Sequence, residues 1–125
     1  MSVTVRRVGE GRFVATAPSG ATVEVGGDGF SPVQLLEAAL AACAATTAEQ
    51  LITRRTGADS AFTVVADGEQ AAHEVRSVDL TFDLPANQPL ATIIPRAVAR
   101  ECTVSRTVEH GAPVTVHLDP DRRQT

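Results

Sequence analysis

Residues 35–51, LLEAALAACAATTAEQL, form a long run of Ala and Leu that constrains the fold more than any other segment. The preceding SPVQ, at 31–34, supplies three helix start signals: an N-cap serine, a proline at the first helical position and a glutamine that completes a capping box. The following RRTG, at 54–57, supplies a cationic last turn and a terminating glycine. The pattern predicts one helix of more than twenty residues.

This helix is apolar on nearly every side. Such a helix normally lies in the middle of a protein, because an exposed helix keeps one polar face. A membrane span is not expected, since the run is mostly alanine and is interrupted at Glu37, Thr46, Thr47 and Glu49. We therefore expect a central helix.

The rest of the chain reads as short strands and one further helix. Apolar and polar residues alternate in several segments, which is typical of half-buried strands, and Pro18-Ser19-Gly20 and Asp67-Gly68 are expected turns. A second helix is expected to begin near Ile94, with Pro95 in its first turn, and to end at His110-Gly111. The expected strands are 2–8, two within 12–25, 61–69, 74–84 and a closing strand at 113–118.

The expected order is three strands, a central helix, two strands, a second helix and a closing strand. Because the strands come in hairpins, the predicted class is α+β with antiparallel sheet rather than a parallel doubly wound fold. One small sheet can cover one side of the long helix but scarcely both. We therefore expect a homodimer, in which a second copy covers the remainder.

Length and composition limit the possible partners. With 125 residues the chain is expected to form a single domain, 1–125, with a polar, mobile tail from about 119. The net charge of −4 and the absence of Tyr and Trp argue against nucleic acid as a partner. The N-terminus has no apolar export segment, so a cytoplasmic location and reduced cysteines are expected, and no membrane partner.

The two cysteines each lie in the middle of an apolar helical stripe. If the two stripes pack together, tertiary contact could bring the sulfurs close. The first stripe is Leu36, Leu40, Cys43, Thr47 and Leu51, and the second is Ile94, Val98, Cys102 and Ser105.

The plain interpretation of each cysteine alone is a buried core side chain, since free cysteine is among the most buried residue types. A zinc site is a poor alternative, because the chain has no CxxC or HxxxH pattern and only three histidines. No cofactor or metal is expected. A catalytic Cys-His pair stays open, although nothing around His73, His110 or His117 supports one.

Two segments together resemble the OsmC/Ohr family of thiol-dependent hydroperoxidases. SPVQLLEAALAACAATTAEQL is similar to the first active-site segment of that family, and ECTVSRTVEHGAPV is similar to the second. The resemblance spans nearly the whole chain in the order and spacing of its elements. Two motifs in register are more specific than either cysteine alone.

The resemblance implies an intertwined homodimer with two central helices and antiparallel sheets wrapped outside them. It implies that Cys43 is the peroxidatic thiol and Cys102 the resolving thiol, that organic hydroperoxides are the substrates, and that a thiol reductant, such as a lipoyl-bearing protein, restores the enzyme. An apolar surround raises the pKa of a thiol, so a positive group is needed to favour the thiolate. By the same resemblance, Arg12 supplies it, with Arg6 or Arg7 as alternatives.

Val33 departs from the hydroperoxide-resistance branch of the family. That branch has a Glu here, paired with the catalytic Arg. Glu37 does not replace it, since it lies about 120° around the helix from Cys43, and Asp28 lies in a loop. The sequence therefore resembles the general OsmC-like branch.

Two other functions remain open at this stage. The chain could be a non-catalytic binding or redox-sensing module that uses an apolar cavity between subunits, which Val33 favours. Alternatively, both cysteines could act on another electrophile, such as a reactive sulfur species.

Overall fold

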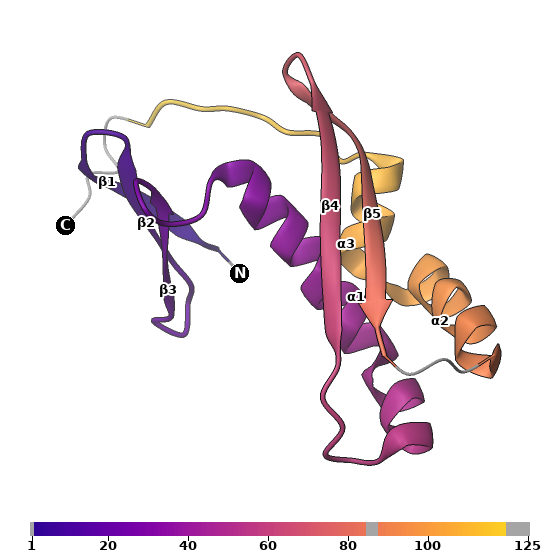
Figure 1. The fold of residues 1–125 in the computed structure, drawn as a ribbon. Helices are drawn as coiled ribbons and strands as arrows, with labels where there is room; N and C mark the ends of the chain where they lie inside the picture. Colours follow the sequence, from indigo (N-terminus) through magenta and orange to yellow (C-terminus); the bar gives the residue numbers. More distant parts are fainter. Residues whose placement is uncertain (1, 85–87, 120–125) are drawn as a thin grey trace.

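The computed structural model describes residues 2–84 and 88–119 and shows an α+β fold with antiparallel sheets (Figure 1). This confirms the predicted class. In chain order the elements are β1 (Thr4–Gly9), β2 (Arg12–Thr16), β3 (Thr22–Gly26), α1 (Pro32–Thr56), β4 (Thr63–Ala71), β5 (Glu74–Asp83), α2 (Gln88–Glu101) and α3 (Thr103–His110).

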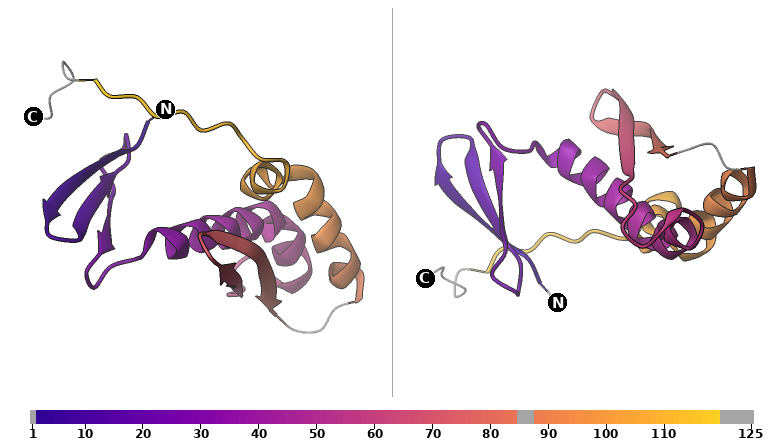
Figure 2. Two further views of the ribbon diagram at one scale, coloured as in Figure 1. Left: turned by 90° about the horizontal axis from the view of Figure 1, so that it is seen from above. Right: turned by 60° about the horizontal axis from the view of Figure 1, so that its bottom comes forward.

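The N-terminal sheet, β1–β3, is a meander of two antiparallel hairpins, as predicted. The turn at Pro18–Gly20 is closed by hydrogen bonds from the N–H groups of Ala17 and Gly20. Val25 is the one fully buried apolar side chain among these strands. The sheet lies at the N-terminal end of α1, apart from the other strands and helices (Figures 1 and 2).

Helix α1 begins and ends where the sequence predicts. The N–H of Gln34 donates to Ser31 Oγ at 3.1 Å, and the N–H of Ser31 donates to Gln34 Oε1 at 2.9 Å, which completes the capping box. At the other end Gly57 has φ 109° and donates to the carbonyl of Thr53. A positive φ favours glycine at this position.

By length and composition alone, α1 could cross a membrane: an 18-residue stretch has a mean hydropathy of 1.3. The central helix of a soluble protein has the same properties, and α1 contacts β4, β5, α2 and α3. Within one chain, however, only 22% of that stretch is buried. Much of its apolar surface therefore has no cover inside a single copy.

The β4–β5 hairpin is longer than expected, and the prediction of a turn at Asp67-Gly68 is wrong. Asp67 pairs with Asp79 and Gly68 with Val78, so both lie inside β4. The chain reverses at Ala72, which has φ 54°. Gly68 instead allows a close approach, because a Cβ there would collide with the carboxylate of Glu37 on α1.

The second helix also differs from the prediction. It begins at Gln88, with Pro95 in its interior, and is interrupted at Cys102, which has φ −76° and ψ 104°. Pro95 removes one hydrogen bond of the helix. Burial of the neighbouring Leu90 and Ile94 against α1 offsets this loss.

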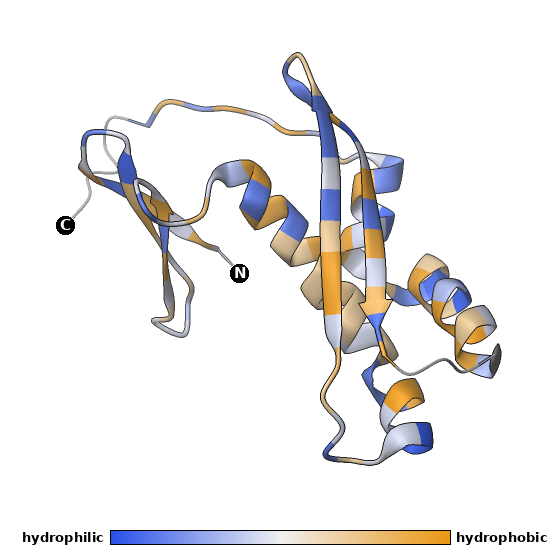
Figure 3. Cartoon of the chain, in the orientation of Figure 1, coloured by the Kyte–Doolittle hydropathy of each residue, from blue (hydrophilic) through white to orange (hydrophobic). Residues whose placement is uncertain are grey.

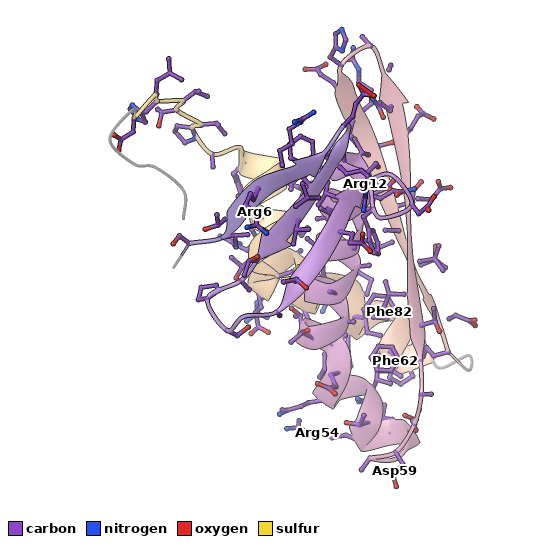
Figure 4. The ribbon with its side chains drawn as sticks, turned by 90° about the vertical axis from the view of Figure 1, so that its left-hand side faces the viewer. Arg6, Arg12, Arg54, Asp59, Phe62 and Phe82 are labelled. Atoms are coloured by element: carbon purple, nitrogen blue, oxygen red, sulfur yellow. The ribbon has the colours of Figure 1, made fainter. Side chains whose placement is uncertain are left out.

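The core lies at the C-terminal half of α1, where α2 packs across it. Its buried residues are Ala48, Ile52, Leu90 and Ile94. The rings of Phe62 and Phe82 stack beside it with centroids 6.3 Å apart (Figure 4). The core therefore holds α2 against α1 next to the cysteines.

Residues 111–119 form an extended arm rather than the predicted closing strand. Apolar and polar residues alternate along it (Figure 3), but it pairs with no strand among the described residues. Val114, Val116 and Leu118 are 86–96% exposed. A strand needs a free edge to pair with, and the arm lies along no strand edge in residues 2–84 and 88–119. Most of the predicted mobile tail lies outside the described residues.

Candidate active site

The structure brings the two cysteines together, as the packing of their stripes predicts. Cys43, in the middle of α1, is half-buried, whereas Cys102, between α2 and α3, is fully buried. The two thiols lie close enough for each to shift the pKa of the other. Both cysteines are free thiols in this structure.

The interruption at Cys102 leaves backbone donors without helical partners. In a continuous helix, the N–H groups of Thr103, Val104 and Ser105 would donate to carbonyls four residues earlier. Here the helical bonds stop with Cys102 N–H donating to Val98 O at 3.1 Å, and resume with Arg106 N–H donating to Cys102 O at 2.9 Å. The three N–H groups between them form the N-terminus of α3.

These three donors face the two sulfurs. The N–H of Val104 has the largest effect on Cys43 and lowers its pKa, while burial opposes it by raising the pKa. The Cys102 thiol, the N–H of Thr103 and the hydroxyl of Thr47 lower the pKa of Cys43 further. Overall the pKa of Cys43 lies below its ordinary value.

Cys102 has the opposite electrostatic environment. Burial, and then its contact with the Cys43 thiol, raise the pKa of Cys102, although the N–H groups of Ser105 and Val104 oppose this. Of the two, Cys43 therefore loses its proton at the lower pH. The half-exposed sulfur is the more nucleophilic one.

Sequence reasoning missed these backbone donors and Thr47. Neither Gly nor Pro occurs at the interruption, so no residue type marks the point where the helix breaks. Thr47 lies one turn beyond Cys43, and its hydroxyl donates to the Cys43 carbonyl at 2.8 Å. Its place on the Cys43 stripe was the only available signal.

Arg12 lies in β2, where its side chain packs beside Gly9 and Gly27 (Figure 4). Within one chain it is not among the groups that influence the pKa of Cys43, and neither are Arg6 and Arg7. Within a single chain, the site therefore consists of the two cysteine thiols, the Thr47 hydroxyl and the N–H groups at the start of α3.

The candidate carboxylates lie on another side of α1. Glu37 and Asp28 both line an open hollow of about 490 Å³ against β4. Val33 is half-buried. No carboxylate of the described residues is among the groups that influence the pKa of Cys43. In residues 2–84 and 88–119, no three His, Cys, Asp or Glu side chains gather as a metal site.

A groove of about 410 Å³ lies beside the cysteines, between α1, β5 and α3. Leu36 and Leu40, on the stripe that leads to Cys43, form one wall. A second hollow of about 310 Å³ adjoins it and shares Leu80, Ser105 and Glu109. The lining of the larger groove is mixed: Leu36, Leu40 and Val78 are apolar, whereas Arg76, Ser77 and Glu109 are polar. It suits a molecule that has both apolar and polar parts.

Solved structures with the same fold are found in distant bacteria. An OsmC-like protein of Mycoplasma pneumoniae matches with a TM-score of 0.71 and 15% identity, over 86% of each chain. A Psychrobacter arcticus protein, described as a putative osmotic stress induced and detoxification response protein, matches with a TM-score of 0.67 and 22% identity, over 86% of this chain and 87% of that one. At these identities the likeness shows the fold alone.

Sequence comparison is more specific. An uncharacterized protein of Mycobacterium tuberculosis is 34% identical over 127 residues, which cover 91% of this chain and 93% of that protein. The family model described as OsmC-like protein matches residues 25–117, a range that includes both cysteines. The chain therefore belongs to the OsmC-like family.

Proposed function

We propose that this protein is a thiol-dependent peroxidase that reduces organic hydroperoxides to alcohols, with Cys43 as the peroxidatic and Cys102 as the resolving thiol. The observation that carries the proposal is the pairing of the two sulfurs at the N-terminus of α3. The N–H groups there lower the pKa of the more exposed thiol, while burial raises the pKa of its neighbour.

The chemistry requires only the two thiols. The Cys43 thiolate attacks the distal oxygen of the hydroperoxide, the O–O bond breaks, and the alkoxide leaves as the alcohol after taking a proton. Cys43 becomes a sulfenic acid. The Cys102 sulfur then attacks the Cys43 sulfur, water leaves and a disulfide forms. A dithiol reductant, such as a lipoyl-bearing protein, returns two electrons and two protons.

The groove between α1, β5 and α3 supports an organic rather than an inorganic peroxide. Leu36, Leu40 and Val78 give one part of its wall an apolar character, while Arg76, Ser77 and Glu109 make another part polar. The groove extends to Ser105, whose N–H faces the Cys102 sulfur. Hydrogen peroxide would gain nothing from such a wall.

A homodimer is the proposed working form. Three parts of the chain leave apolar surface uncovered: α1, the N-terminal sheet and the arm at 111–119. A second copy has the same uncovered surfaces, so two copies could cover each other. In that assembly, Arg12 of one copy would lie against the helices of the other and act as the thiolate stabiliser that one chain lacks.

Membership of the family, together with two free thiols, supports a role in oxidative or osmotic stress defence in the cytoplasm. Thiols persist in that reducing compartment, and a dithiol reductant is available there. We therefore propose stress defence as the role of the Cys43–Cys102 thiol pair.

Intact mass after peroxide treatment tests the proposal. With a slight excess of cumene hydroperoxide, the reduced protein should become lighter by two hydrogens per chain. Cys102→Ser should instead gain one oxygen, as a stable sulfenic acid, and Cys43→Ser should change in neither way. Unchanged wild-type mass together with unconsumed peroxide would refute the peroxidase.

A second candidate function is a binding or redox-sensing module, favoured by the apolar Val33 and by the absence of Arg12 from the site of a single chain. Its signature would be an apolar ligand co-purifying in native mass spectrometry, with no catalytic turnover of peroxide in the presence of a dithiol reductant. If the protein is a peroxidase, we expect no co-purified ligand, and we expect peroxide to be consumed.

A further inference from the structure

The interruption at Cys102 leaves carbonyls as well as N–H groups without helical partners. One of these carbonyls, that of Ala99, accepts a hydrogen bond from a side chain instead. In a continuous helix the carbonyl of Ala99 would accept the N–H of Thr103. Here it accepts a hydrogen bond from Arg106 Nη1 at 3.3 Å. The arginine side chain has taken the place of a backbone donor that faces Cys43.

Arg106 bonds to both sides of the interruption. Its side chain reaches Ala99 in the last turn of α2, and its own N–H donates to the carbonyl of Cys102 at 2.9 Å. Cys102 itself provides no side-chain cap for α3. No other side-chain hydrogen bond in residues 2–84 and 88–119 is shown to link α2 with α3.

We propose that Arg106 is a positioning residue that holds the α2–α3 interruption open and so keeps the N–H groups of Thr103 and Val104 directed at the Cys43 sulfur. Without its guanidinium, the exposed Ala99 carbonyl has only water as a competing donor, and the N–H of Thr103 can close the helical bond to it. Closure of that helical bond takes a donor away from the thiolate. This inference rests on the proposed role of Cys43 as the reacting thiolate.

The contact acts through the backbone rather than through charge. Arg106 is not among the groups that influence the pKa of Cys43 directly, and in the described part of the chain Cys102 is the one titratable group that does. Any shift on removing Arg106 therefore reports on the position of the N–H donors. A titration of Cys43 can detect this.

The test is the pH profile of Cys43 alkylation by iodoacetamide in the full-length, reduced protein, resolved from Cys102 by peptide mass spectrometry. In Arg106→Ala, the rate at pH 6.5 should fall by about tenfold or more, as expected from losing one hydrogen bond to a thiolate. The plateau rate at high pH should stay within about twofold of wild type, because access to the sulfur is unchanged.

Two further variants separate capping from charge. Arg106→Gln keeps a donor without the charge and should restore part of the wild-type rate, whereas Arg100→Ala removes a nearby charge from α2 and should leave the profile unchanged. A wild-type profile in Arg106→Ala would overturn the inference. So would an equal loss in Arg100→Ala, or no rescue by Gln.

Alkylation needs no peroxide, so the two proposals fail separately. If Arg106→Ala shifts the profile while the wild type leaves cumene hydroperoxide intact, the positioning role stands and the peroxidase is wrong. If peroxide is consumed and the profile does not move, the peroxidase stands and the positioning role is wrong.

Discussion

The N-terminal sheet and the helical cluster of α1, α2 and α3 use similar apolar side chains but bury them very differently. In the sheet, Val5 is 58% exposed and Val25 alone is buried. In the cluster, Ala48, Ile52 and Leu90 are almost completely buried. The cluster therefore holds together by its own contacts, whereas the sheet and the arm lack a covering surface.

The largest expected effect comes from placing a charge on the arm. In Val116→Asp a carboxylate would be buried without a partner in each copy of the proposed dimer, at a cost of several kcal/mol. Sedimentation velocity should show a monomer where the wild type is a dimer. Thr115→Asp, on the opposite side of the alternation, is the control and should remain dimeric. If both variants remain dimeric, the arm does not contribute to the dimer interface.

Shortening a buried side chain of the helical cluster should have a smaller effect on the free energy of unfolding, and this effect should not depend on dimer formation. Ile52→Ala leaves a cavity in the core and should lower the free energy of unfolding by about 2–5 kcal/mol. The exposed Gln50→Ala on the same helix should change it by less than about 0.5 kcal/mol. Urea unfolding at two protein concentrations measures both. A loss for Ile52→Ala below 1 kcal/mol would contradict a core built at this position.

Within the cluster, the two thiols should differ in reactivity by about tenfold or more at pH 7. A thiol with a lowered pKa keeps its thiolate as the pH falls, so Cys43 should reach half its maximal alkylation rate below the ordinary cysteine value of about 8.5. Cys102, with its raised pKa, should do so above that value. Pulsed iodoacetamide labelling measures both sites at once. Equal rates, or a faster Cys102, would reverse the assignment of roles.

The smallest effect is expected at the junction of the two regions, where Ser31 caps α1. Ser31→Ala removes the bond to the N–H of Gln34 and should lower the free energy of unfolding by about 1 kcal/mol. Ser31→Asp retains an N-cap acceptor and should stay close to wild type. Thermal unfolding of the three proteins gives the comparison. If Ser31→Asp lowers the free energy of unfolding as much as Ser31→Ala does, the N-cap hydrogen bond does not stabilise the start of α1.

The sequence predicted those parts of the fold that local chemistry decides. The start of α1 follows from its serine, proline and glutamine, and its end from Gly57, because each signal acts within one helical turn. Alternation located the first three strands for the same reason.

Features that depend on distant contacts could not be predicted in this way. Gly68 resembles a turn residue, but it pairs with Val78 inside β4 and lies beside Glu37 of another element. At the interruption, the Arg106 side chain bonds to Ala99, and α3 packs against α1, so residues of separate elements meet there. The sequence thus located both thiols but pointed to Arg12, and not to the backbone donors, for lowering the pKa of Cys43.

The exposed arm has a kinetic consequence. If residues 113–118 find their neighbouring strand only in a second copy, the last step of folding is a bimolecular collision. Refolding after dilution from urea would then slow as the protein concentration falls, while the helical cluster would form first, at a rate independent of concentration. Newly made chains would carry Val114, Val116 and Leu118 uncovered until they met one another.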